Sequence, residues 1–324
     1  MKQSVNQSDK QSDNQKKNDF SKGSVVGNIM KLAVPMTLAQ LINVLYNIVD
    51  RIYIGMIPEN ATLSLTGLGL CLPIISIVIA FANLFGMGGA PLCSIERGRG
   101  NEKEAEAIMG NSFVMMVAVG ILLTVLGLMF KRPMLYLFGA SDATISYADA
   151  YVTVYLMGNI FVMTGLGMNS FINSQGFGTV GMMTVLLGAV TNIVLDPVFI
   201  FLLDMGVAGA AWATVIAQFA SCAFAFCFLI GKKVPIKIIR LKKEMFSKNI
   251  TARIMGLGLS PFLILATDSI LLIVMNTVLQ KYGGPEQGDM LITCATIVQS
   301  YMLLITSPMI GISGGTQAII SYNY

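Results

Sequence analysis

The sequence predicts an all-α membrane protein, a polytopic bundle of about eight transmembrane helices. Hydrophobic residues make up 55% of the chain and charged residues only 12%, and the apolar residues occur in long uninterrupted runs. Because the hydrocarbon layer of a membrane offers no water to backbone groups, runs of about 20 apolar residues select helices. A soluble core does not have this composition.

Eight apolar runs are long enough to cross a membrane. We expect spans near Ile29–Met56, Leu63–Phe85, Ile108–Phe130, Ala148–Ile172, Val180–Leu203, Ala208–Ile230, Ile254–Leu279 and Met290–Ile312. Residues 1–28 precede them and have the polar composition of a disordered tail. The first apolar run is long enough to span, so we do not interpret the N-terminus as a secretory signal.

A basic linker, residues 231–253, divides the spans into six before it and two after it. An internal repeat supports this division, because Pro35 matches Pro261 and Gly88-Gly89 matches Gly314-Gly315 at the same offset. We therefore expect a transporter of two six-helix lobes, with twelve spans in all. In this interpretation residues 29–230 form the first lobe, and residues 254–324 are the first two helices of a truncated second lobe.

The distribution of Lys and Arg predicts the orientation in the membrane. Basic residues concentrate in the N-terminal tail, in the loop after the second predicted span and in the linker. Cytoplasmic loops carry an excess of Lys and Arg, so we expect a multi-pass protein of the cell membrane with a cytoplasmic N-terminus. The linker is expected to be attracted to anionic headgroups of the bilayer, and no nucleic-acid partner is expected.

Two residue types limit the chemistry. The chain contains no histidine, which excludes His-dependent metalloenzymes and histidine-based pH switches. The five cysteines show no CxxC spacing and lie mostly in apolar runs, so neither a disulfide nor a resident metal is predicted. We do not expect an enzyme.

Acidic residues inside apolar spans are costly and therefore mark candidate functional sites. Three are clear: Asp50, Asp196 and Asp268. On the first span, a polar stripe occupies positions i, i+3, i+7 and i+10, which share one helical face. Its members are Gln40, Asn43, Asn47 and Asp50.

The fifth and sixth spans carry a second polar group. Asn192 and Asp196 are four residues apart, hence stacked on one face, and Thr214 lies early in the sixth span. From the rise of 1.5 Å per residue we expect Asp50, Asp196 and Thr214 to reach the same outer layer of the bundle. Two neighbouring carboxylates resist ionising together, so such a cluster can hold a proton or a small monovalent cation such as Na⁺.

Simpler interpretations remain for each residue. Asp50 and Arg51 are adjacent near the end of a span and can form an interfacial ion pair. Asn192 can have a purely structural role, forming a hydrogen bond between two helices. Asp268 allows either a site or a packing role, and the sequence does not rank them.

Several motifs resemble one transporter family. These are Asn47-Ile48-Val49-Asp50-Arg51-Ile52-Tyr53-Ile54-Gly55, Asn192-Ile193-Val194-Leu195-Asp196-Pro197 and Gly206-Val207-Ala208-Gly209-Ala210-Ala211-Trp212-Ala213-Thr214. Together they are similar to the multidrug and toxic compound extrusion (MATE) family over nearly all of residues 29–324. The resemblance implies a V-shaped pair of lobes that exchanges H⁺ or Na⁺ for amphipathic, often cationic, drugs, without another cofactor and as a monomer.

The resemblance also assigns roles to residues. It implies that Asp50, Asn192, Asp196 and Thr214 bind the coupling ion, that Pro35 bends the first helix, and that Tyr151 is an aromatic neighbour of the site. Some members carry a glutamate on helix 7 for sodium, whereas this helix has Asp268 and Asn276. The resemblance therefore leaves the coupling ion open.

The leading hypothesis is thus a cation-coupled multidrug antiporter. One alternative is a lipid-linked oligosaccharide flippase of the same superfamily, although its cavity needs Arg or Lys for pyrophosphate, and the first-lobe spans carry none away from their ends. Another alternative is an intramembrane aspartyl protease, since two membrane aspartates can share a proton. The Gly-x-Gly-Asp segment typical of that class is missing at Asp50 and Asp196.

Overall fold

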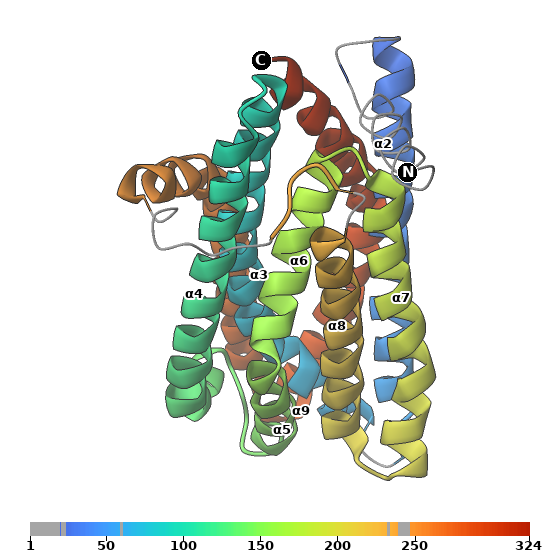
Figure 1. The fold of residues 1–324 in the computed structure, drawn as a ribbon. Coiled ribbons are helices and arrows are strands. Elements are labelled where there is room, and N and C mark those ends of the chain that lie inside the picture. The colour runs from blue at the N-terminus through green and yellow to red at the C-terminus, as the bar shows by residue number, and fades with distance from the viewer. Residues whose placement is uncertain (1–19, 21–23, 59–60, 232–233, 239–246) are drawn as a thin grey trace.

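A computed structural model describes residues 20, 24–58, 61–231, 234–238 and 247–324 (Figure 1). In these residues the secondary structure is entirely helical, which confirms the predicted all-α class. The elements are α2 (Val25–Gly55), α3 (Ala61–Gly98), α4 (Glu102–Leu137), α5 (Ile145–Met157), α6 (Asn159–Ser174), α7 (Gly178–Pro197), the π-helical turn η1 (Val198–Leu202), α8 (Gly206–Ile230) and α9 (Lys248–Asn323).

Seven helices in the described residues are long and apolar enough to cross a membrane, and the bent pair α5 and α6 makes an eighth span. Helix α9 contains two of the seven, Lys248–Gly284 and Gln287–Asn323. They meet at Gly284, whose φ of 63° lies outside the helical region. A bundle of about eight spans is therefore confirmed.

The helices extend beyond the predicted spans. Helix α2 begins at Val25, inside the predicted tail, because Ser24 precedes it as N-cap and accepts a 3.5 Å hydrogen bond from the Gly27 N–H. The rest of that tail, apart from Phe20, lies outside the described residues, as do 232–233 and 239–246 of the linker. The end of the linker, from Lys248, forms the first turns of α9.

The fourth span is bent, which the sequence did not predict. Helices α5 and α6 meet at Gly158 at an angle of 58°. A Cβ on Gly158 would overlap the Val215 side chain, so only glycine permits this contact with α8. Next to the bend, Asn159 Nδ2 donates to the Gly120 carbonyl at 3.1 Å, and Thr124 Oγ1 donates to the Leu156 carbonyl at 2.9 Å.

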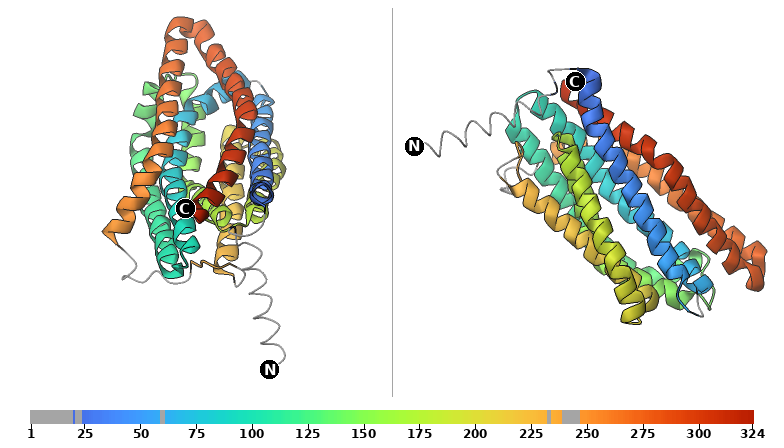
Figure 2. Two further views of the ribbon diagram at one scale, coloured as in Figure 1. Left: turned by 90° about the horizontal axis from the view of Figure 1, so that it is seen from above. Right: turned by 90° about the vertical axis from the view of Figure 1, so that its right-hand side faces the viewer.

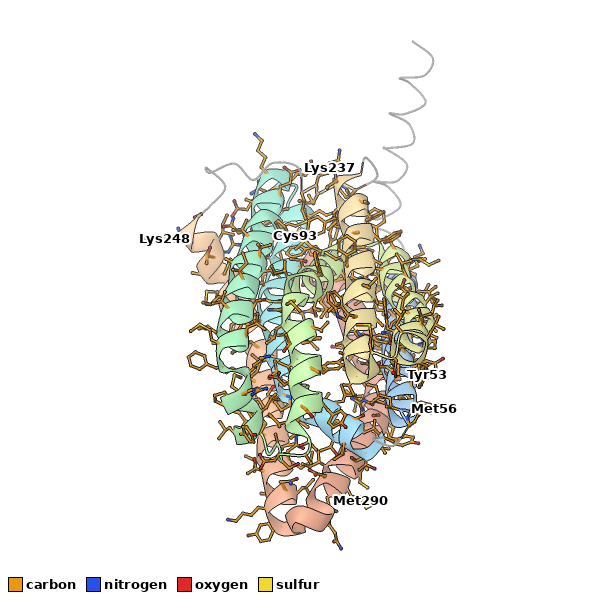
Figure 3. The ribbon with its side chains drawn as sticks, turned by 90° about the horizontal axis from the view of Figure 1, so that it is seen from below. Tyr53, Met56, Cys93, Lys237, Lys248 and Met290 are labelled. Carbon is orange, nitrogen blue, oxygen red and sulfur yellow. The ribbon has the colours of Figure 1, made fainter. Side chains whose placement is uncertain are left out.

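Helix α9 packs against α3 with both of its spans and against α2 with its second, and its two halves meet at an apex (Figure 2). We call the end of the bundle where α2 begins the inner end, and the end where α2 finishes the outer end. Tyr53, Met56 and Met290 lie toward the outer end, whereas Cys93, Lys237 and Lys248 lie toward the inner end (Figure 3).

Candidate functional site

Four of the predicted site residues come together in the outer half of the bundle. Asp50 lies on α2, Asn192 and Asp196 lie on α7, and Thr214 lies on α8. Helix α7 packs against both α2 and α8, which brings the three helices to one place. Only 6% of Asp50 is exposed, and Asn192 and Asp196 are fully buried.

Hydrogen bonds join the members of this cluster. The Asn192 amide donates to Asp196 Oδ1 at 3.2 Å and to Thr214 Oγ1 at 3.4 Å. Asp50 and Asp196 lie close enough for one carboxyl group to hydrogen-bond the other when one of them holds a proton. The four side chains therefore form one polar group within an apolar bundle.

Three oxygen atoms of the cluster have no hydrogen-bond partner among the described residues: Asp50 Oδ1, Asn192 Oδ1 and Asp196 Oδ2. Buried polar atoms are almost always paired, because an unpaired one loses its hydration without compensation. Acceptor oxygens that converge in this way can be satisfied by a proton or by a monovalent cation. The chemistry of the cluster therefore fits the binding of a small cation.

Tyrosine side chains surround the carboxylates. Tyr151 neighbours Thr214, and its ring stacks on Tyr155 with centroids 6.3 Å apart. Sequence reasoning missed Tyr46, which neighbours Asp50 and Gln218. A signal existed, because Tyr46 lies four residues before Asp50 and therefore on the same face of the helix.

The remaining residues of the predicted stripe lie outside the cluster. Asn47 donates to the carbonyl and side-chain oxygens of Asn43, at 2.7 and 3.0 Å. Gln40 is ten residues from Asp50, which places it roughly 15 Å closer to the inner end. Pro35 is half-buried within α2, which continues as one helix through it.

Arg51 does not form the ion pair that was considered for Asp50. No salt bridge joins the two side chains in the part of the chain that the structure describes. Instead, Arg51 Nη1 donates to the Thr296 carbonyl at 2.9 Å and to the Ser300 hydroxyl, both on α9.

The acidic and amide residues of α9 are separate from the cluster. Asp268 is exposed on the first span of α9. Asn276, which corresponds to Asp50 in the internal repeat, is buried and donates to the Gly69 carbonyl at 3.4 Å. It holds α9 against α3.

Comparison with known proteins identifies the family. The MatE family model matches residues 35–198, about half of the chain, and this stretch includes Asp50, Asn192 and Asp196. The chain belongs to the MATE family. The resemblance predicted from the motifs is thereby confirmed.

Curated relatives of this MATE protein are the multidrug export proteins MepA of Staphylococcus saprophyticus and Staphylococcus haemolyticus. Each is 27% identical over 305 residues, which cover 94% of this chain and 66% of the relative. The chain thus spans about two thirds of the length of the relatives it matches.

Solved MATE structures share the fold. The MATE multidrug transporter DinF-BH aligns with a TM-score of 0.86 at 29% identity, covering 93% of this chain and 66% of that one. An outward-facing multidrug resistance transporter of the MOP superfamily aligns with a TM-score of 0.80 at 25% identity, again over 93% and 66%.

Proposed function

We propose that this protein is a secondary active antiporter that exports amphipathic or cationic drugs in exchange for H⁺ or Na⁺. The observation that carries the proposal is the buried cluster of Asp50, Asn192, Asp196 and Thr214, with its three unpartnered oxygens among the described residues. Relatives named as multidrug export proteins support the drug substrates. The absence of histidine from the sequence leaves carboxylates to carry the ion.

The cluster has the chemistry needed for coupling. Two neighbouring carboxylates in an apolar bundle are unfavourable when both are ionised, because each has lost its hydration and they repel one another. Loading a proton or Na⁺ removes this cost, whereas release of the ion restores it. We infer that Asp50 and Asp196 alternate between ion-loaded and empty states. This difference in free energy drives the transition between the inward-open and outward-open conformations.

The charge distribution supports an orientation with the inner end in the cytoplasm. Arg97, Arg99 and Lys103 lie at the inner ends of α3 and α4, and Lys237 and Lys248 lie toward the same end (Figure 3). Fewer basic residues lie near the outer end, where α2, α4 and the first span of α9 finish: Arg51, Lys131, Arg132 and Lys281. By the positive-inside rule, we place the protein in the cell membrane with its N-terminus in the cytoplasm. The family resemblance further suggests a monomer.

The proposal is tested by efflux of a fluorescent cationic dye from cells that express the full-length protein. Asp196→Asn should reduce efflux to the level of cells without the protein, because a neutral amide cannot carry the ion. Asp204→Asn is the matched control: it is the same chemical change, at an exposed residue between η1 and α8. Its positive φ of 51° also suits asparagine.

The coupling ion is identified by collapsing the proton and sodium gradients in turn during the same assay. We expect collapse of one of the two gradients to abolish efflux by the unmodified protein. Retention of full efflux by a well-expressed Asp196→Asn variant would overturn the assignment of the ion site. No dye efflux from the unmodified protein would favour the flippase alternative instead.

A further inference from the structure

Arg51 borders the carboxylate cluster and also bonds to α9. It follows Asp50 on α2, and its guanidinium group reaches the Thr296 carbonyl and the Ser300 hydroxyl on the second span of α9. These residues are 245 and 249 positions away in the sequence. Arg51 therefore links the cluster to the interface between α9 and the first six spans.

The charge of Arg51 makes this link sensitive to its surroundings. A guanidinium group stays protonated in proteins and needs acceptors wherever it is shielded from water. Arg51 is half-buried, and the acceptors it uses on α9 are both uncharged. An ionised carboxylate is a stronger acceptor for a guanidinium group than a carbonyl or a hydroxyl.

Few other charged or titratable groups in the described residues compete for Arg51. Asp50 and Tyr151 face it, and Asp196 and Tyr46 face Asp50 in turn. The neighbouring outer cations Lys131 and Arg132 both pair with Asp149, at 3.0 and 3.6 Å. The charge of Asp50 is therefore the variable that changes most strongly beside Arg51 when the cluster loads or releases an ion.

We propose that Arg51 couples the ion load of Asp50 to closure of the outer end by alternating between α9 and the Asp50 carboxylate. When Asp50 holds a proton or Na⁺, it attracts Arg51 weakly, and Arg51 bonds to Thr296 and Ser300. When Asp50 is empty and ionised, it draws the guanidinium group away from α9. Arg51 is thus a positioning residue, and this inference rests on the proposed antiport at the same cluster.

The direction of this coupling agrees with antiport. An exporter that takes up its ion from outside must return to the inward-facing state with the ion bound, so the loaded state must close the outer end. The contacts of Arg51 with α9 stabilise that closed state. Loss of the ion on the inner side then weakens them and prepares the outer end to open with the drug bound.

The test measures the width of the outer end as the ion is varied. Spin labels at Met56→Cys and Met290→Cys, both exposed and both near the outer end, report the separation of α2 and α9 (Figure 3). The exposed native Cys227 and Cys294 are replaced by Ser, while the buried Cys71, Cys93 and Cys222 are retained. Distances are measured in the full-length protein reconstituted in lipid, over a pH series without sodium and a sodium series at fixed pH.

Ser300→Ala is the informative variant because Ser300 lies outside the ion cluster. In the unmodified protein the distance should shorten as the ion is added. In Ser300→Ala we expect the ratio of closed to open molecules at a given ion concentration to fall roughly tenfold, as for loss of one hydrogen bond to a charged group. The matched control is Ser307→Ala, another buried serine of α9, which bonds to the Leu304 carbonyl of its own helix at 3.2 Å.

Arg51→Gln tests the charge itself. It should flatten the dependence of the distance on the ion, whereas a merely structural role would lower stability without changing that dependence. The proposal is overturned if Ser300→Ala and Arg51→Gln follow the ion as the unmodified protein does, or if the distance never responds to the ion. Gradient-driven dye efflux that still requires Asp196 would then leave the proposed function standing and remove only the role of Arg51.

Discussion

The interface between α9 and helices α2 to α4 is built differently at its two ends. At the inner end the backbones touch: a Cβ on Gly258 would overlap the Leu84 carbonyl of α3, and one on Gly315 would overlap the backbone of Ala33 on α2. At the outer end side chains bridge the gap. Thr66 and Thr293 lie with their hydroxyl oxygens 2.8 Å apart.

More polar bridges belong to the outer end. Thr66 also donates to the Asp289 carbonyl at 2.9 Å, Ser141 donates to Asp289 Oδ2 at 3.2 Å, and Thr277 donates to the Leu137 carbonyl at 3.3 Å. Together with the contacts of Arg51, they form a polar seam between α9 and helices α2 to α4, to which Ser141 contributes from the loop after α4.

The difference shows which end can separate more easily. Small residues at helix crossings in membranes allow close van der Waals packing, which nothing replaces when the helices part. Side-chain hydrogen bonds, by contrast, can be exchanged for bonds to water when the outer end opens, at a small net cost in free energy. We therefore expect the polar seam of the outer end to open before the glycine contacts of the inner end do.

The largest effect is expected at the glycine contact of Gly258. Gly258→Ala places a methyl group against the Leu84 backbone, which cannot move aside as a side chain can. We expect the free energy of unfolding to fall by about 3 kcal/mol, the upper range for overpacking. With the exposed Cys227 and Cys294 replaced by Ser, a thiol-reactive dye reports the exposure of the buried Cys71, Cys93 and Cys222 during thermal unfolding in detergent.

The control for this prediction lies two residues away. Apart from its own stretch of helix, no atom of the described residues lies within 4 Å of a Cβ on Gly256, so Gly256→Ala should keep or raise the unfolding midpoint. Similar losses in both variants would contradict the view that the inner end depends on close backbone contact.

A smaller effect is expected at the ion pair of the inner end. Glu96 accepts a 3.1 Å hydrogen bond from Arg253 of α9, and its side chain is only 7% exposed. Glu96→Gln should lower the free energy of unfolding by about 2 kcal/mol, because it removes the charged acceptor of a mostly buried bond.

Glu104 offers a comparison, because it forms a second ion pair with the same arginine. It contacts Arg253 at 3.3 Å but is 33% exposed, and such solvated pairs contribute less than about 1 kcal/mol. Glu104→Gln should therefore shift the unfolding midpoint by less than Glu96→Gln. The reverse order would show that burial does not govern the strength of this end.

The sequence predicted the spans and the cluster because both depend on local signals. Apolar runs locate helices in a membrane without reference to tertiary contacts. Asp50, Asn192 and Asp196 stand out because ionisable and amide groups are rare in such runs, and helical spacing and rise placed them in one layer.

Features that depend on distant contacts were not predictable in this way. Gly158 looks like any other glycine in an apolar run, and its role in the bend follows from the position of Val215 on α8. Arg51 was considered as a partner of Asp50 because the two are adjacent, whereas its acceptors lie some 245 residues later. A single sequence does not indicate which residues far apart in the chain are in contact.

The smallest effect is expected within the polar seam, at Thr66 and Thr293. Replacing both by valine keeps their shape and removes the bridge between α3 and α9. A double-mutant cycle should give a coupling energy of about 0.5–1 kcal/mol, as for one neutral hydrogen bond. Thr306→Val serves as the control partner, because Thr306 is exposed and bonds within its own helix. A coupling energy larger than that of the Glu96 and Arg253 pair would mean that the outer end is held together more strongly than the inner end. The proposed order of opening would then be wrong.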